Sequence, residues 1–120
     1  MAAAIQEARN DGYTILSEAQ VKVTGNFLGT RNYDFLGRDS FGNIVGFEVK
    51  TSMSDTVKLD RSQVLKDISV MQFGGASKFG PFNSVAYKTM CDGCAPVDAR
   101  SAVLRSLLSE SKIPFDEIVK

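Results

Sequence analysis

Histidine is absent from this sequence of 120 residues. Its absence excludes histidine-dependent nuclease mechanisms, serine–histidine and cysteine–histidine nucleophiles, and zinc sites that need an imidazole ligand. Acid–base chemistry would then fall to carboxylates, lysines or water bound to a metal. The acidic and basic side chains are therefore where a reaction centre has to be sought.

Long apolar runs are also lacking, and none approaches the roughly 20 residues that a membrane helix needs. The N-terminus, Met-Ala-Ala-Ala-Ile-Gln-Glu, does not have the basic and then apolar regions of a secretory signal. We expect a chain without a membrane span that does not direct its own export. Its length predicts a single domain over residues 1–120.

Cysteine is scarce, and both copies lie in the segment Cys91-Asp-Gly-Cys94. Two thiols supply at most half of a four-thiolate zinc site, and neither a second pair nor a histidine completes it. A redox role stays open, although Asp92-Gly93 is typical of a turn. We expect two thiols in a loop, or a disulfide if the domain passes through an oxidising compartment.

Net charge is zero, because 14 Lys and Arg balance 14 Asp and Glu. The distribution is less even, since residues 20–90 hold nine basic against six acidic side chains. Contacts with phosphate need basic surface only within about one Debye length, roughly 8 to 10 Å. A modest basic patch and an ordinary solvated surface both fit this count.

Two segments rich in aromatic and β-branched residues, 32–36 and 44–50, flank a short stretch of turn composition. This stretch is Asp39-Ser-Phe-Gly-Asn43. Its residues favour a type I turn followed by a left-handed residue. The sequence therefore predicts a β-hairpin centred on Phe41.

The predicted hairpin brings three charged side chains to one face of a sheet. Asp34 lies opposite Glu48, and Lys50 shares the face of Glu48 because side chains alternate along a strand. Like charges in opposite positions destabilise a hairpin, so a compensating cation is expected. A divalent metal such as magnesium can supply it, with phosphate oxygens as further ligands. The alternative is a solvated face on which Lys50 pairs with the two acids.

The residues around this triplet resemble the PD-(D/E)xK nuclease superfamily, and within it the nuclease domains of bacterial polymorphic and contact-dependent inhibition toxins. The resemblance covers roughly residues 2–72. Tyr33 stands where the superfamily's name has proline, as in many members. The matching pieces are a first helix over 2–10 before Gly12, a strand over 14–24, Arg31-Asn-Tyr-Asp34-Phe35, Gly42-Asn43, Glu48-Val49-Lys50-Thr51 and Arg61-Ser-Gln63.

The resemblance implies an α/β single-domain restriction-endonuclease-like fold, with a mixed central β-sheet flanked by helices. It implies that Asp34, Glu48 and the Val49 carbonyl hold magnesium, or else manganese or zinc. The ion would lower the pKa of a bound water and neutralise charge on the phosphate. Lys50 would position that water or stabilise the charge that develops on the phosphate oxygens.

Two further site residues follow from the resemblance. Members of the superfamily often add an acid from the first helix, a place that Glu7 fits, whereas Glu18 is expected to face outward. Gln63 matches the family's glutamine and would touch phosphate or the attacking water. It could equally be the capping-box partner of Asp60, and both interpretations stay open.

The implied function is that of a metal-dependent endonuclease of DNA or tRNA that serves as the toxin domain of an interbacterial growth-inhibition system. Such a domain is delivered as part of a larger secreted toxin, acts in the cytoplasm of the target bacterium, and is neutralised by an immunity protein. Lys58, Arg61 and Lys66 are expected to contact nucleic acid. The alternatives are a nucleic-acid-binding module without catalysis, and an adaptor or interaction domain in which the motif is coincidental.

The other segments are predicted to form the scaffold. We expect a helix between Asp60 and Gly74, a mobile loop over 74–83, a strand over 84–90 and a last helix over 97–111. The apolar stripes of the two helices comprise Val64, Leu65, Ile68 and Met71 in the first and Val103, Leu104, Leu107 and Leu108 in the second.

Overall fold

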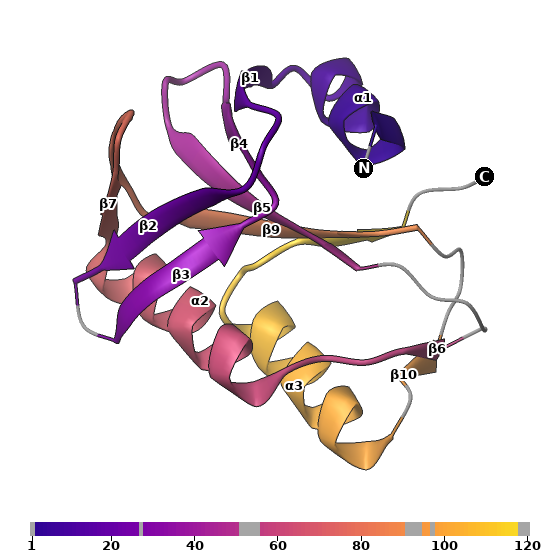
Figure 1. Ribbon diagram of the computed structural model, residues 1–120. Helices are drawn as coiled ribbons and strands as arrows, with labels where there is room; N and C mark the ends of the chain where they lie inside the picture. Colours follow the sequence, from indigo (N-terminus) through magenta and orange to yellow (C-terminus); the bar gives the residue numbers. More distant parts are fainter. Residues whose placement is uncertain (1, 27, 51–55, 91–94, 97, 118–120) are drawn as a thin grey trace.

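The computed structural model describes residues 2–26, 28–50, 56–90, 95–96 and 98–117. A mixed five-stranded sheet lies at its centre, in the order β1-β4-β5-β9-β11 (Figure 1). Three of these strands are antiparallel neighbours: β1 (Thr14–Ser17), β4 (Phe35–Arg38) and β5 (Ile44–Lys50). The strands β9 (Ser84–Thr89) and β11 (Phe115–Glu117) continue the sheet in parallel. The expected α/β fold with a mixed sheet is confirmed.

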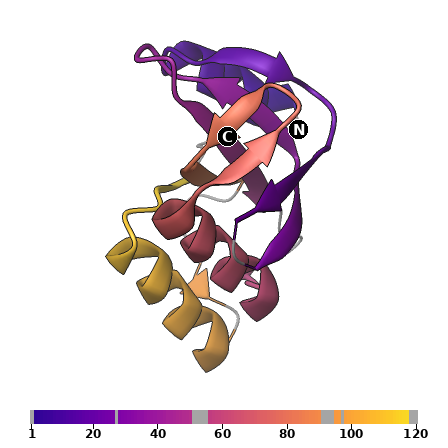
Figure 2. The ribbon, with the colours of Figure 1, turned by 90° about the vertical axis from the view of Figure 1, so that its left-hand side faces the viewer.

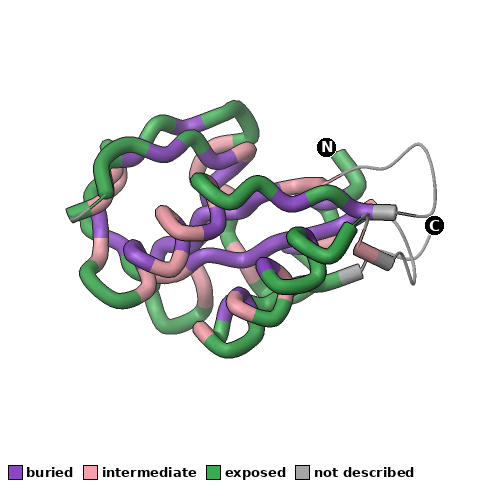
Figure 3. The backbone as a smooth tube through the Cα atoms, turned by 90° about the horizontal axis from the view of Figure 1, so that it is seen from below, coloured by how far each residue is buried: buried purple, intermediate pink, exposed green. Residues whose placement is uncertain are grey.

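Helices cover both faces of this sheet. α1 (Ala2–Asn10) packs on one face, where its apolar side chains meet Phe35 and Phe47. α2 (Arg61–Phe73) and α3 (Ala99–Glu110) cover the other face, and Leu104 and Leu108 of α3 belong to the larger core cluster there. Figure 3 shows that the buried backbone runs mainly along the central strands, whereas much of the helical surface is exposed. Among the described helices, none is long and apolar enough to cross a membrane.

A second sheet has the order β3-β2-β7-β8 and stands beside the first. It consists of β2 (Val21–Gly25), β3 (Gly29–Tyr33), β7 (Gly75–Ser77) and β8 (Gly80–Phe82). Figure 2 faces its β7–β8 hairpin. A two-stranded parallel pair, β6 (Thr56–Val57) with β10 (Ala95–Pro96), completes the strands of the described residues.

Three sequence-based expectations about strands were wrong. The strand expected over 14–24 is two strands, and the one expected over 32–36 is broken at Asp34, because at both places the chain passes from one sheet to the other. The loop expected over 74–83 is the β7–β8 hairpin. Its glycines allow close packing on β2, since a Cβ on Gly75 would lie 3.0 Å from the Thr24 carbonyl oxygen. Hydrophobic alternation within one strand does not reveal a change of sheet.

The hairpin register is confirmed. Phe35 pairs with Phe47 and Arg38 pairs with Ile44, so the β4–β5 hairpin is centred on Phe41 as predicted. An Asp39 carboxylate oxygen accepts hydrogen bonds from the backbone N–H groups of Phe41 and Asn43, both at 2.9 Å. These contacts close the turn and thereby fix the register that brings the site residues together.

The two later helices and their caps agree with the sequence, but their buried stripes differ. Asp60 caps α2, and α2 ends at Phe73 before Gly74, whose φ is 79°. Within α2 a fully buried Asp67 lies between Val64 and Val70. The expected stripe on α2 is buried only in part, because Leu65, Ile68 and Met71 are half-buried.

In α3, capped by Asp98, Val103 points outward, with 60% of its surface exposed. The expectation that Val103 packs in the core was therefore wrong.

Candidate functional site

A polar cleft with a volume of about 490 Å³ opens between β3, the end of β5 and the first turns of α2. All three residues that the sequence put forward as metal ligands line it, and few apolar groups do. The residues that line it are Gln20, Thr30, Arg31, Asn32, Asp34, Glu48, Val49, Ser62, Gln63 and Lys66.

Asp34 occupies the bend between β3 and β4, where the chain changes sheets. Its Oδ2 accepts a hydrogen bond of 2.7 Å from the Val49 backbone N–H, and its own N–H donates to the Phe47 carbonyl at 2.9 Å. The bend thus holds the Asp34 carboxylate against the strand that carries Glu48. This position was predicted from the hairpin register.

Glu48 is buried, with 6% of its surface exposed, and lies beside Asp34. Burial raises the pKa of Glu48 to about 7, because the charged form loses its hydration. The charge of Arg31 opposes this rise in pKa, the charge of Asp34 adds to it, and Lys50 opposes it. Near neutral pH Glu48 therefore holds a proton part of the time, and a divalent cation could replace that proton.

Lys50 and Gln63 connect the end of β5 to the start of α2. The Lys50 ammonium donates to Gln63 Oε1 at 3.0 Å. Gln63 also takes part in the helix cap, since its backbone N–H donates to Asp60 at 2.9 Å. The contact with Asp60 uses only the Gln63 backbone, whereas a capping box needs the Gln63 side chain, which contacts Lys50. The capping-box and site interpretations of Gln63 both stay predictions.

Arg31 and Asp67 form a buried ion pair directly behind Glu48. Arg31 Nε donates to Asp67 Oδ1 and Arg31 NH2 donates to Asp67 Oδ2, each at 3.2 Å. The same nitrogen, Arg31 Nη2, also donates to Glu48 Oε1 at 3.2 Å. The hydroxyls of Tyr33 and Tyr87 also donate to Asp67. The wall of the cleft therefore contains Arg31, whose guanidinium is held in place by the buried Asp67.

Sequence reasoning missed Asp67 and gave Arg31 no role beyond its place in the motif. A signal for Asp67 was present, because it lies three residues from both Val64 and Val70 and hence on the face of α2 that they bury. A carboxylate on a buried helical face needs a partner. The sequence could not show that this partner is Arg31.

Three expected site residues lie elsewhere. Glu7 is on α1, across the sheet from the cleft, where its carboxylate contacts Lys88 at 3.1 Å. Its expected role in the site was wrong, because α1 packs on the other sheet face. Arg61 lines a different groove, beside Val103 of α3. The exposed Lys58 acts electrostatically on Asp98, the cap of α3.

Of the three expected nucleic-acid contacts, Lys66 alone lines the cleft. Its ammonium donates to the Thr30 carbonyl at 3.0 Å. Thr51, Cys91 and Cys94 lie outside the described residues. The expectations about the two thiols and about Thr51 in the motif therefore stay predictions.

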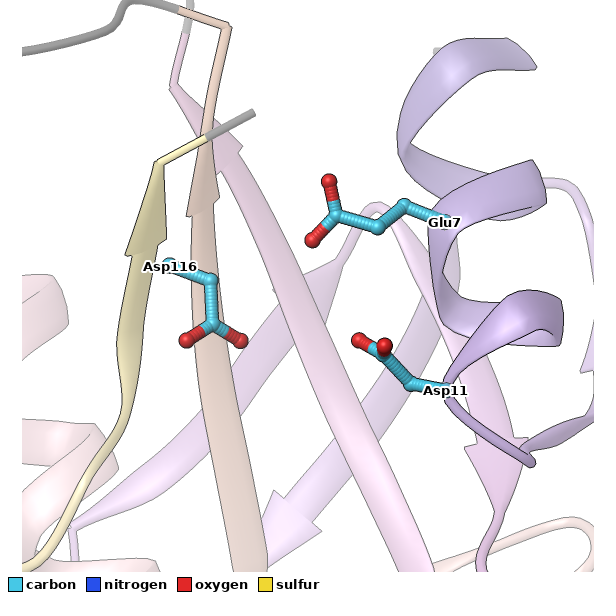
Figure 4. A group of neighbouring side chains, drawn as sticks. All are labelled: Glu7, Asp11 and Asp116. Carbon is cyan, nitrogen blue, oxygen red and sulfur yellow. The ribbon is translucent and has the colours of Figure 1, made fainter. Parts of the chain in front are cut away.

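A second acidic cluster lies across the sheet, and Figure 4 shows its members Glu7, Asp11 and Asp116 converging from α1, the segment after it and β11. One oxygen from each lies within 4.8 Å of the others, close enough to share a cation. The Lys88 ammonium contacts all three carboxylates, at 3.1, 3.6 and 3.4 Å. The side chains of Asp11 and Asp116 are about half exposed, so water stabilises them together with Lys88, whereas the carboxylate of Glu48 is buried.

Comparisons with protein-family models, with curated proteins and with solved structures found no match to this chain. The geometry of the cleft and the motif on its strands therefore carry the functional argument.

Proposed function

We propose that the protein is a metal-dependent nuclease of the PD-(D/E)xK type, with its reaction centre in the Asp34–Glu48 cleft. One observation carries the proposal: the carboxylates of Asp34, at the bend before β4, and of Glu48, on β5, lie together at an open polar cleft near Lys50. Such a pair of hard oxygen ligands suits Mg²⁺, with Mn²⁺ and Zn²⁺ as alternatives.

The order of elements also supports the proposal. The resemblance implies a helix, a strand, the strand that carries the aspartate, a hairpin to the E-x-K strand, and a helix with a glutamine. The chain has α1, β1, β4, β5 and α2 in this order, with Asp34 directly before β4. The strands β2 and β3 are inserted between β1 and β4, and β6 lies between β5 and α2. β9 then returns parallel to β5 after α2.

Each site residue would have its own role in metal binding or in catalysis. Asp34, Glu48 and the Val49 carbonyl would hold the ion, which supplies Lewis-acid chemistry that activates water and neutralises phosphate charge. Glu48 must first lose its proton, because only the ionised form binds a cation well. Lys50, held by Gln63, would place its positive charge beside the phosphate oxygens, where charge develops during in-line attack.

We further propose that the nuclease serves as a growth-inhibition toxin. It would be delivered within a larger protein, act in the cytoplasm of a target bacterium and be silenced by an immunity protein in the producing cell. The motif's resemblance to such toxin domains supports this part. Expression in a bacterium without a partner should arrest growth, and Glu48→Gln should relieve the arrest. Equal growth of both strains would contradict the toxin role.

The decisive experiment is a cleavage assay with two substrates. Plasmid DNA and tRNA are each incubated with the protein and Mg²⁺, Mn²⁺ or Zn²⁺, and parallel samples contain EDTA. We expect cleavage of at least one substrate with metal and none with EDTA. Binding of nucleic acid without cleavage under any condition would favour a binding module, and neither binding nor cleavage would favour an adaptor or interaction domain.

A further inference from the structure

The buried side of the cleft contains a carboxylate that the proposed reaction does not use. Asp67 is completely buried and carries no contact with the cleft itself. It nevertheless receives four hydrogen bonds, two from Arg31 and one from each of the Tyr33 and Tyr87 hydroxyls. Four donors on two oxygens satisfy the charge of Asp67 without water.

These contacts leave Arg31 little freedom to move. Nε and NH2 are bound to Asp67, NH1 donates to the Asn32 carbonyl, and the guanidinium lies 4.7 Å from the centre of the Tyr33 ring. The Tyr33 ring in turn packs on Gly46 of β5, where a Cβ would meet ring carbons at 2.7 Å. Arg31 is thus held on one side by a planar carboxylate and on the other by a ring that has its own fixed place.

Glu48 needs such a support more than an ordinary carboxylate does. Its neighbour Asp34 is a like charge, so once Glu48 has lost its proton, repulsion between the two carboxylates favours other positions of the Glu48 side chain. Arg31 NH2 contacts Glu48 Oε1 at 3.2 Å and leaves the second oxygen free of Arg31. An arginine without an anchor would instead move between the two cleft carboxylates and take the place of a metal.

We propose that Asp67, acting through Arg31, is the positioning residue for Glu48: the buried Asp67–Tyr33–Tyr87 cage fixes the guanidinium, which orients one Glu48 oxygen toward the metal. This inference rests on the proposed function, because it assigns the cage a role in metal binding. A purely structural ion pair would affect only the stability of the fold. A positioning pair also determines how tightly the cleft holds an ion.

The test measures Mn²⁺ affinity by electron paramagnetic resonance, at a temperature where each variant is shown by circular dichroism to be folded. Asp67→Asn keeps the shape but loses the charge. Arg31→Lys keeps the charge but cannot make the forked contact with Asp67 while touching Glu48. We expect the Kd for Mn²⁺ to rise about tenfold or more in both variants, the range seen for groups that support metal ligands.

Tyr87→Phe is the milder variant, in case the charged changes prevent folding. It removes one hydrogen bond to Asp67 and keeps the aromatic ring of Tyr87, the register partner of Glu48 on the neighbouring strand. We expect about a threefold rise in the Kd for Mn²⁺, smaller than that for Asp67→Asn because three donors remain. The matched controls are Asp116→Asn, Arg100→Lys and Tyr13→Phe, which should each stay within about twofold of wild type.

Excess metal separates positioning from catalysis. Saturating Mn²⁺ should restore the cleavage rate of Asp67→Asn to nearly that of wild type, because every group that touches substrate or metal is present. The same treatment should not restore Glu48→Gln. Wild-type Mn²⁺ affinity in the folded cage variants, or tighter binding in Arg31→Lys, would overturn the inference while leaving the nuclease intact. A wild-type protein that neither binds Mn²⁺ nor cleaves would overturn both.

Discussion

The central sheet separates two ionic clusters of opposite design. On one face, the Lys88 ammonium is buried, with 1% of its side chain exposed, among Glu7, Asp11 and Asp116. On the other face, Asp34 and Glu48 adjoin an open cleft. Lys88 is the register partner of Val49, the neighbour of Glu48, so the two clusters lie back to back on the same pair of strands.

The difference concerns where the compensating charge comes from. Three carboxylates surround Lys88, but the side chains of Asp11 and Asp116 are about half exposed, so water stabilises them as well. Glu48 is nearly buried beside a like charge, and Arg31, its closest cation, is shared with Asp67. The number of carboxylates is therefore a poor guide to a metal site. Burial and unshared negative charge are better ones.

The largest expected effect is on catalysis and is confined to the cleft. Asp34→Asn, Glu48→Gln and Lys50→Ala should each reduce cleavage by roughly a hundredfold or more, because each removes a group that binds the ion or stabilises transition-state charge. Asp116→Asn, in the opposite cluster, should stay within about twofold of wild type. Initial rates of cleavage under saturating Mg²⁺ measure this contrast. Full activity in any of the three cleft variants would remove that residue from the proposed site.

The second largest effect is on stability, and here substitution in the Lys88 cluster should have a larger effect than substitution in the cleft. Lys88→Met removes the cation that three carboxylates share. Because two of these carboxylates are half-exposed to water, we expect a loss of about 1 to 2 kcal/mol in the free energy of unfolding. Lys50→Met should change it by less than about 1 kcal/mol, because Lys50 is only half-buried and its partner Gln63 is neutral. Urea denaturation without metal measures both. Equal losses would mean that the two clusters do not differ in the way described.

The pH dependence distinguishes the clusters further. Because the pKa of Glu48 is raised to about 7, the folded chain binds more protons than the unfolded chain between about pH 4.5 and 7. Stability should therefore fall by a few kcal/mol as pH rises through this window and then level off. Mn²⁺ affinity should rise over the same window, since ionised Glu48 is the ligand.

Two variants provide the controls for the pH series. Glu48→Gln should abolish the fall in stability between pH 4.5 and 7. Lys88→Met should keep that fall, because the interactions with Glu7 and Asp116 raise the pKa of Lys88 above its ordinary value. Its contribution is fully present below about pH 10 and is lost only at higher pH. A fall in stability that persists in Glu48→Gln would assign the proton to another group.

The sequence predicted the arrangement within the β4–β5 hairpin better than the division of the strands between two sheets. The turn that begins at Asp39 determines the hairpin register, which pairs Phe35 with Phe47 and so brings Asp34, the residue before β4, next to the segment of β5 that carries Glu48 and Lys50. These are local relations, which strand periodicity and turn chemistry express directly.

The errors concern long-range relations. Glu7 was placed correctly on a helix, but nothing within that helix shows which face of the sheet it covers. The bend at Asp34 lies where the chain leaves β3, in the second sheet, for β4, in the central sheet, and this change of sheet depends on how the two sheets pack together. Asp67 can be buried because Arg31 and Tyr87, which are 36 and 20 positions away in the sequence, donate hydrogen bonds to it. Such relations require the tertiary structure.

The smallest expected effect concerns the basic residues of α2. Lys66 lines the cleft, whereas Arg61 lines a groove of about 720 Å³ next to Val103. Lys66→Ala should weaken binding of uncleaved nucleic acid in EDTA by about three- to tenfold and reduce the slope of log affinity against log salt by about 1, as for the loss of one phosphate contact. Arg61→Ala should change either quantity much less.

Fluorescence anisotropy over a series of salt concentrations measures both variants. Thermal unfolding serves as the control, because Lys66 also donates to the Thr30 carbonyl and its loss loosens the contact between α2 and β3. If Arg61→Ala weakened binding as much as Lys66→Ala, the nucleic acid would run along the groove between α2 and α3. Arg61 would then contact nucleic acid, as expected from the sequence.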